Sequence, residues 1–440
     1  MVALSQLTIW GVATLLVIAL PLHCAWAQNA TLDELLQRHQ ADPQNGLLCE
    51  QIGVAYTRMN DLNHAAVYFR KAVAIDGGRV SARKNLATVL WFLGEKNESS
   101  SLFESLEKII PNDPVPQLYL ALGAYDKKNI ESAAFHFERA GAAATDNPET
   151  LPLVIDTWLR TNRSEAVKHL LEARIATDAR DAQTYRWLGA AYDHLKQPDQ
   201  ASAAYSEALN LEPKSEENYL ALAGFALDHA NPGYARKILE QGLAQVPRSA
   251  KLLLEMGLAW AIQGDFERAR SWFKDANGAQ ADWPLPLLAL GVTDLQTGNA
   301  AGAAESFRRA KEFAPNDYRC FYLHALALNR SHDENDVSVR ATEAADLRRA
   351  IQLEGHFAKA RVALAETEIA DGATADAETQ LRAAIQYEPD EPSSYYRLAL
   401  LCRREGKSAE AARLLRTFEQ LKTKAHAEEN EFVLLLKVPN

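Results

Sequence analysis

The chain has 440 residues, 48% of them hydrophobic and 24% charged, with a formal net charge of −11. This composition is typical of a folded chain and excludes a largely disordered one. Because an acidic chain has no bulk attraction to phosphate backbones, it also argues against general nucleic-acid binding. The length fits two or three ordinary domains or one long repeat array.

The first 27 residues are predicted to be a signal peptide. An uncharged apolar stretch at residues 7–22 is short for a membrane span, which needs about 20 residues, and Ala25 and Ala27 form a small-residue cleavage site. We expect cleavage before Gln28 and an exported bacterial protein, periplasmic or secreted, that no longer inserts into a membrane. The leader before the apolar stretch contains no Lys or Arg. An uncleaved anchor in the inner membrane is therefore the alternative.

Residues 28–45 are predicted to cap the N-terminal end of the fold. Within them, residues 30–41 have the pattern of a short amphipathic helix. A helix with one polar face can cover the apolar end of a stacked array.

From residue 46 to residue 423, small and bulky residues recur with a spacing of 34 or its double. A small residue recurs in what we expect to be the second helix of each unit, at Ala65, Ala133, Ala201, Ala235, Ala269, Ala303, Ala377 and Ala411. A bulky residue follows four positions later, as at Phe273 and Phe307. The spacing between Ala303 and Ala377 is 74, which holds two units and six extra residues.

This pattern resembles the tetratricopeptide repeat. The resemblance implies an all-α, right-handed solenoid of about eleven helix–turn–helix repeats. The small residues would let helix axes approach to about 8–10 Å, and the bulky ones would fill the space between neighbouring pairs. Because one helix pair cannot bury its apolar stripe alone, the units are expected to stack.

Residues 424–440 are predicted to form a C-terminal cap or tail. Their apolar segment at residues 432–437 has two interpretations. It either folds back onto the last repeat or pairs with another chain.

The sequence contains no signature of a nucleotide-binding loop, a zinc protease or a serine hydrolase. We therefore predict a protein that is not an enzyme and needs no cofactor. The acidic insertion at residues 332–336 lacks the glycine and the spacing of a calcium loop, so we expect a solvated loop there. Cys49, Cys320 and Cys402 are spaced too far apart along the array for disulfides, and Cys49 and Cys402 fall at core-facing positions.

Relatives of this repeat family usually bind ligands along a concave face lined by the first helices. Carried over to this chain, that face contains an apolar set at Leu254, Leu258, Leu285, Leu288, Val292 and Leu295. An exposed apolar patch would suit an amphipathic helix or an extended peptide. The alternative is that tight curvature buries these residues against neighbouring helices.

The same face is expected to carry a basic end at Arg319, Tyr322, Arg330, Lys359, Tyr396, Arg403 and Arg404. Arginine grips carboxylates with two parallel hydrogen bonds, so an acidic segment would fit there, whereas ordinary scatter of charge is the alternative. The sequence thus predicts a non-catalytic scaffold of the cell envelope or secreted space that binds a protein or peptide. A membrane-tethered envelope assembly factor is the second hypothesis. The partner and the oligomeric state are not specified by the sequence.

Overall fold

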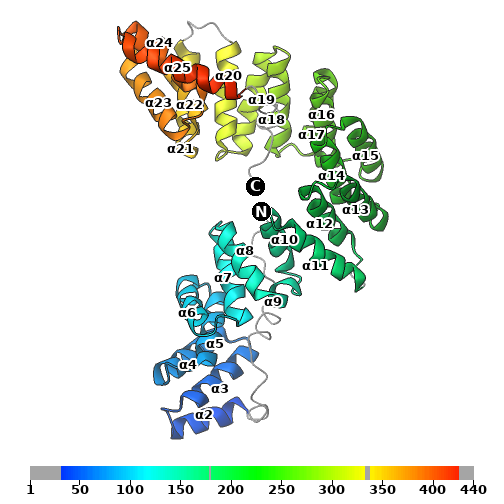
Figure 1. The fold of residues 1–440 in the computed structure, drawn as a ribbon, viewed down its shortest axis with the longest axis vertical. Helices are drawn as coiled ribbons and strands as arrows, with labels where there is room; N and C mark the ends of the chain where they lie inside the picture. Colours follow the sequence, from blue (N-terminus) through cyan, green and yellow to red (C-terminus); the bar gives the residue numbers. More distant parts are fainter. Residues whose placement is uncertain (1–30, 178–179, 332–336, 426–440) are drawn as a thin grey trace. The chain divides into compact units, whose positions relative to one another are not determined.

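The computed structural model describes residues 31–177, 180–331 and 337–425, and the regular elements in these ranges are all helices (Figure 1). This confirms the predicted all-α class. The chain divides between Ala204 and Tyr205, inside one helix, into two compact units.

The helices of the first unit are α2 (Leu32–Ala41), α3 (Gly46–Arg58), α4 (Leu62–Ile75), α5 (Val80–Phe92), α6 (Lys96–Ile109), α7 (Pro114–Asp126), α8 (Ile130–Ala140), α9 (Ala142–Thr145), α10 (Leu151–Arg160), α11 (Ser164–Ala176) and α12 (Ala182–His194). Helix α13 (Pro198–Leu211) contains the boundary.

The helices of the second unit are α14 (Glu216–Asp228), α15 (Pro232–Gln245), α16 (Ala250–Ile262), α17 (Phe266–Ala279), α18 (Pro284–Gln296), α19 (Ala300–Phe313), α20 (Tyr318–Ser331), α21 (Val337–Leu353), α22 (Ala358–Ala370), α23 (Thr374–Tyr387), α24 (Pro392–Arg404) and α25 (Ser408–Ala425). With α2 and the one-turn α9 set aside, the helices form eleven successive pairs, as predicted.

In ten of the eleven pairs, the turn between the two helices is made by a described residue with a left-handed backbone. Five pairs use glycine, for example Gly264 at φ +79°, and five use another residue, for example Ala230 at φ +51°. Such a residue ends the first helix and lets the chain reverse direction. Glycine adopts this conformation without the steric cost that a Cβ brings.

Close contact between small and aromatic residues holds several of the pairs together. A Cβ built on Gly257 would lie 2.4 Å from the Phe273 ring, and one on Gly291 would lie 2.5 Å from the Phe307 ring. Both phenylalanines are fully buried. The predicted role of the small residues, which is to let paired helices touch, is confirmed at these positions.

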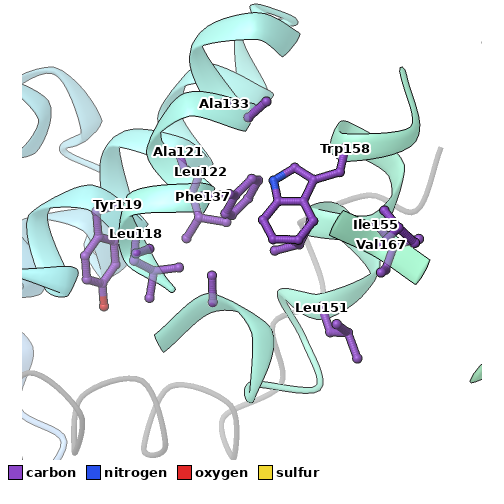
Figure 2. Packing of buried hydrophobic residues seen from close by; sticks show 14 of the residues in the cluster. Leu118, Tyr119, Ala121, Leu122, Ala133, Phe137, Leu151, Ile155, Trp158 and Val167 are labelled. Atoms are coloured by element: carbon purple, nitrogen blue, oxygen red, sulfur yellow. The ribbon is translucent and has the colours of Figure 1, made fainter. Parts of the chain in front are cut away.

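Within each compact unit, buried side chains of successive pairs form shared hydrophobic clusters. In the first unit, Figure 2 shows Phe137 of α8 and Trp158 of α10 pointing into the space between those helices. Phe137 is fully buried and Trp158 is 8% exposed. Because the bulky side chains of one pair fill the space beside the next, the pairs stabilise each other.

Helix α2 packs on the first helix pair from within the predicted capping segment 28–45. Its N-terminus is closed by Thr31 and Glu34, which bond each other's backbone N–H groups. Leu35 is buried beside Leu48 and Ile52 of α3. The inner side of α2 therefore completes the core at this end.

Several predictions fall outside the described residues: the signal peptide at 1–27, the insertion at 332–336 and the apolar segment at 432–437. Helix α25 continues to Ala425, two residues beyond the predicted end of the array.

In the ranges that the structure does describe, no helix has the length and apolar character needed to cross a membrane. The thiols of Cys49, Cys320 and Cys402 are buried and unpaired.

Candidate functional site

The six apolar residues predicted to line an open groove lie in the core or at its margin. Leu254, Leu288 and Val292 are only 4%, 0% and 3% exposed, so the expectation of an open apolar surface is wrong for these three. Half-buried positions against the same core cluster are occupied by the other three: Leu258, Leu285 and Leu295. Because the helix pairs approach closely, the inner leucines of α16 and α18 contact core side chains instead of solvent.

Two residues of the predicted basic end, Arg319 and Tyr322, are occupied by contacts within the protein. Arg319 is 9% exposed, and its Nη2 donates to Asp317 Oδ2 at 2.6 Å. Tyr322 is half-buried, with its ring edge-on to Phe357 at 4.9 Å between centroids. The prediction that Arg319 grips a ligand is therefore corrected, since its charge is neutralised at the start of α20.

The other basic-end residues differ in their surroundings. Arg330 and Arg403 are exposed, and Lys359 is half-buried. Tyr396 is 38% exposed and packs on Phe418. Of all seven predicted residues, Arg404 alone lines the pocket described next.

A pocket of about 550 Å³ opens among α20, α21, α22 and α24, within the second unit. Its apolar wall consists of Leu328, Val339, Ile369, Ala370, Leu400 and Leu401. Its polar lining consists of Asn329, Arg340, Glu343, Glu366, Thr367, Arg397 and Arg404. A cavity of this size with an apolar wall and a few converging polar groups is typical of ligand sites.

The six-residue insertion helps to build this pocket. Helix α21 has 17 residues, whereas the corresponding α19 and α23 have 14 each. In register with those helices, α21 begins three residues earlier, or nearly one turn. Val339 belongs to this added turn and lines the pocket. Next to it, Arg340 Nε donates to Asp371 Oδ1 at 2.9 Å and ties α21 to the end of α22.

Glu343 occupies the position that carries alanine in eight other repeats. Aligned on the fully buried Leu347 and Ala350, it matches Ala303 in α19 and Ala377 in α23. It is only 5% exposed. Glu343 was not among the predicted site residues, although it is the one glutamate at this position of the repeats.

Hydrogen bonds hold the Glu343 carboxylate in place. Thr367 Oγ1 donates to Glu343 Oε1 at 3.1 Å, and Asn329 Nδ2 donates to the same oxygen at 3.3 Å. Burial raises the pKa of Glu343, and the hydrogen bonds from Thr367 and Asn329 oppose this rise. The nearby negative charge of Glu366 raises the pKa further.

The remaining charges of the pocket are partly neutralised. Glu366 forms an ion pair with Arg397, but burial still raises the pKa of its carboxyl. Arg404 is exposed and makes no hydrogen bond or ion pair with any residue in the described ranges. The pocket thus offers an outer guanidinium and two desolvated carboxylates. Among the residues that the structure covers, no cluster of three or more His, Cys, Asp or Glu side chains could hold a metal ion.

Several segments of this chain match the sequence profiles of a known repeat family. Profiles described as tetratricopeptide repeat match residues 48–78, 182–215, 220–286 and 362–425. A curated relative, the anaphase-promoting complex subunit cut9 of Schizosaccharomyces pombe, is 23% identical over 222 residues, or 49% of this chain. The match spans 33% of the length of that relative.

Several solved structures are similar in part. The Cut9–Hcn1 hetero-tetramer has a TM-score of 0.43 at 14% identity, covering 81% of this chain and 76% of that one. Yeast Tom70 has a TM-score of 0.41 at 14% identity, and the match covers 87% of this chain and 95% of Tom70. MamA of Desulfovibrio magneticus RS-1 has a TM-score of 0.36 at 19% identity, and the match covers 40% of this chain and 96% of the MamA chain. The matched profiles, together with eleven helix pairs in the phase that the sequence predicts, identify the chain as a tetratricopeptide-repeat protein.

Proposed function

We propose that this protein is a scaffold that binds a peptide segment of a partner protein in the pocket between α20, α21, α22 and α24. The repeat fold is one used for protein–protein interaction. The observation that carries the proposal is the pocket itself, whose volume of about 550 Å³ lies in the range of known ligand sites. Its apolar wall can hold an aliphatic side chain, while Arg404 can pair with a carboxylate of the same segment.

A binding role, without chemistry, agrees with the groups in the pocket. The polar lining consists of carboxylates, guanidinium groups, one hydroxyl and one amide. Thr367 Oγ1 lies within hydrogen-bond distance of Glu343, but it also bonds the Ala363 carbonyl oxygen at 3.2 Å, as a helical threonine commonly does. We therefore assign this threonine a structural role and propose no catalytic step.

Selection from a displayed library of random peptides on the purified chain tests the proposal. Ala370 is exposed at the end of α22 and lines the pocket, so Ala370→Trp would fill the pocket without disturbing the core. Ala375→Trp, on the exposed side of α23 and outside the pocket lining, is the matched control. We expect enriched peptides that bind the parent chain and the control but not Ala370→Trp. Peptides that bind all three equally, or no enrichment, would contradict the proposal.

We further propose that the protein acts in the envelope or secreted space after export. The support is the apolar stretch at residues 7–22, followed by Ala25 and Ala27 at a cleavage position. N-terminal sequencing of the mature protein from its native host is expected to begin at Gln28. An intact N-terminus on a membrane-bound protein would favour the tethered assembly factor instead.

A further inference from the structure

One carboxylate oxygen in the pocket lacks a partner. Both hydrogen bonds to Glu343 end on Oε1. Its second oxygen, Oε2, has no hydrogen bond or ion pair with any part of the chain that the structure describes. Because Glu343 is only 5% exposed, its carboxylate gives up most of its hydration. The two hydrogen bonds that Oε1 accepts from neutral donors do not compensate for this loss.

The charges facing Glu343 do not supply the missing compensation. Glu366 faces it from α22 with a like charge that raises its pKa, and the opposite effect of Arg340, on its own helix α21, is smaller. Arg340 already bonds Asp371, and Arg397 is held by Glu366. Arg404 is not among the charges that act on the Glu343 carboxyl. The inner part of the pocket is therefore short of positive charge, although three arginines line it.

Glu343 joins α21 to α20 and α22 through hydrogen bonds, but its position in the repeat does not need a polar side chain to hold the helices together. In α19 and α23 the matching residues, Ala303 and Ala377, are fully buried and apolar. A buried glutamate at a helix-contact position costs stability relative to alanine, since its charge must be desolvated. Binding of a ligand would explain why a residue that weakens the scaffold lines this cavity.

We propose that the inner end of the pocket binds a cationic side chain of the ligand, a lysine or arginine, through Glu343 and Glu366, while Arg404 pairs with a carboxylate nearer the opening. This inference rests on the proposed function and gives the partner segment its chemistry: a basic residue close to an acidic one. The bound cation donates to Glu343 Oε2, and the apolar wall contacts its aliphatic stem.

Two small probes test the cation directly. One is N-acetyl-lysine N-methylamide, which presents a lysine side chain without backbone charges, and the other is its norleucine counterpart, which has the same stem without the ammonium. Ligand-observed NMR titration on the full chain is expected to show at least tenfold tighter binding of the lysine probe. Binding should weaken as the pH falls through the raised pKa of Glu343, because protonation removes the attraction.

Three variants locate the effect. Glu343→Ala introduces the residue that eight other repeats carry, so it is expected to fold and to lose the preference for the lysine probe. Glu366→Gln should weaken that preference. Glu405→Gln, which changes an exposed glutamate outside the pocket lining, should leave it intact. Equal binding of the two probes by the parent chain, or an unchanged preference in Glu343→Ala, would overturn the inference.

The two tests fail in different ways. If displayed peptides are lost in Ala370→Trp but carry no basic residue and bind Glu343→Ala normally, the pocket is a binding site and the cationic assignment is wrong. If Ala370→Trp changes neither peptide nor probe binding, the proposed function is wrong as well.

Discussion

The Cα hydrogen of Gly257 faces the ring of Phe273 so closely that a Cβ at position 257 would lie 2.4 Å from Cε1. Glycine here sets the distance between α16 and α17. In the second repeat, Ala87 and the fully buried Phe103 occupy the corresponding positions, which shows that a pair can be built with one more carbon if its helices settle differently.

We expect Gly257→Ala to lower the free energy of unfolding by about 1–3 kcal/mol, since the added methyl forces a shift in a packed core. Chemical denaturation followed by circular dichroism measures the change. Gly224→Ala is the control, because Gly224 lies within α14 with no atom within 4 Å of the added carbon. It should stabilise by about 0.5–1 kcal/mol through the better helix propensity of alanine. A Gly257→Ala variant as stable as the parent would show that the pair adjusts freely.

The turn residues allow a reciprocal exchange. Ala230 and Gly264 hold the same turn position with φ of +51° and +79°. Ala230→Gly is expected to stabilise by about 0.5–1 kcal/mol as left-handed strain is relieved, and Gly264→Ala to destabilise by about 1–2 kcal/mol. The denaturation midpoints of the two variants, compared with that of the parent chain, measure both changes in stability. Changes of the same sign would contradict the role given to backbone conformation.

Glu255 on α16 is expected to make stability depend on pH. Burial, with the nearby charge of Asp228, raises the pKa of this half-buried carboxyl from 4.5 to about 7. Since the folded state binds the proton more tightly than the unfolded state, this group favours folding at low pH, and that contribution is lost as the pH rises from about 4.5 to about 7. Glu255→Gln should be more stable than the parent by about 1–3 kcal/mol above this window and equal to it below. Unfolding midpoints across the window measure the difference, and a constant offset would contradict the prediction.

The two C-terminal arginines of α24 should differ in function although both are exposed. Arg404 lines the pocket and Arg403 does not. For an acidic peptide selected on the pocket, Arg404→Ala is expected to cost about 1 kcal/mol of binding free energy, or about fivefold in affinity, while Arg403→Ala has no effect. Fluorescence polarisation measures both. Equal losses would indicate a diffuse basic surface in place of a pocket contact.

The repeat phase was predictable because it depends on contacts that recur in every pair. A small residue opposite a phenylalanine has the same geometric consequence in α16 and α17 as in α18 and α19, so the spacing alone located the helices. The three thiols were also predicted to remain unpaired, and they are. Burial of Leu254 and Leu288 was not settled by the sequence, because it depends on how closely one pair approaches the next.

The pocket could not be predicted, since it depends on where the six extra residues are accommodated. The sequence located the insertion but not its division between the turn and the start of α21. The residues of the basic end were predicted from their place on the concave face and their side-chain type, which do not reveal that Arg319 is paired with Asp317. Glu343 is predictable in principle, because a glutamate where eight other repeats have alanine departs from the pattern at a helix-contact position.

The added turn of α21 leaves the spacing of the repeats that follow unchanged, since Ala377 and Ala411 are again 34 residues apart. A change of chain length in one unit is thus absorbed where it occurs. Over evolutionary time, an array of this kind can acquire a new recognition feature by lengthening a single hairpin, while the older units on either side keep their packing and need no compensating mutations.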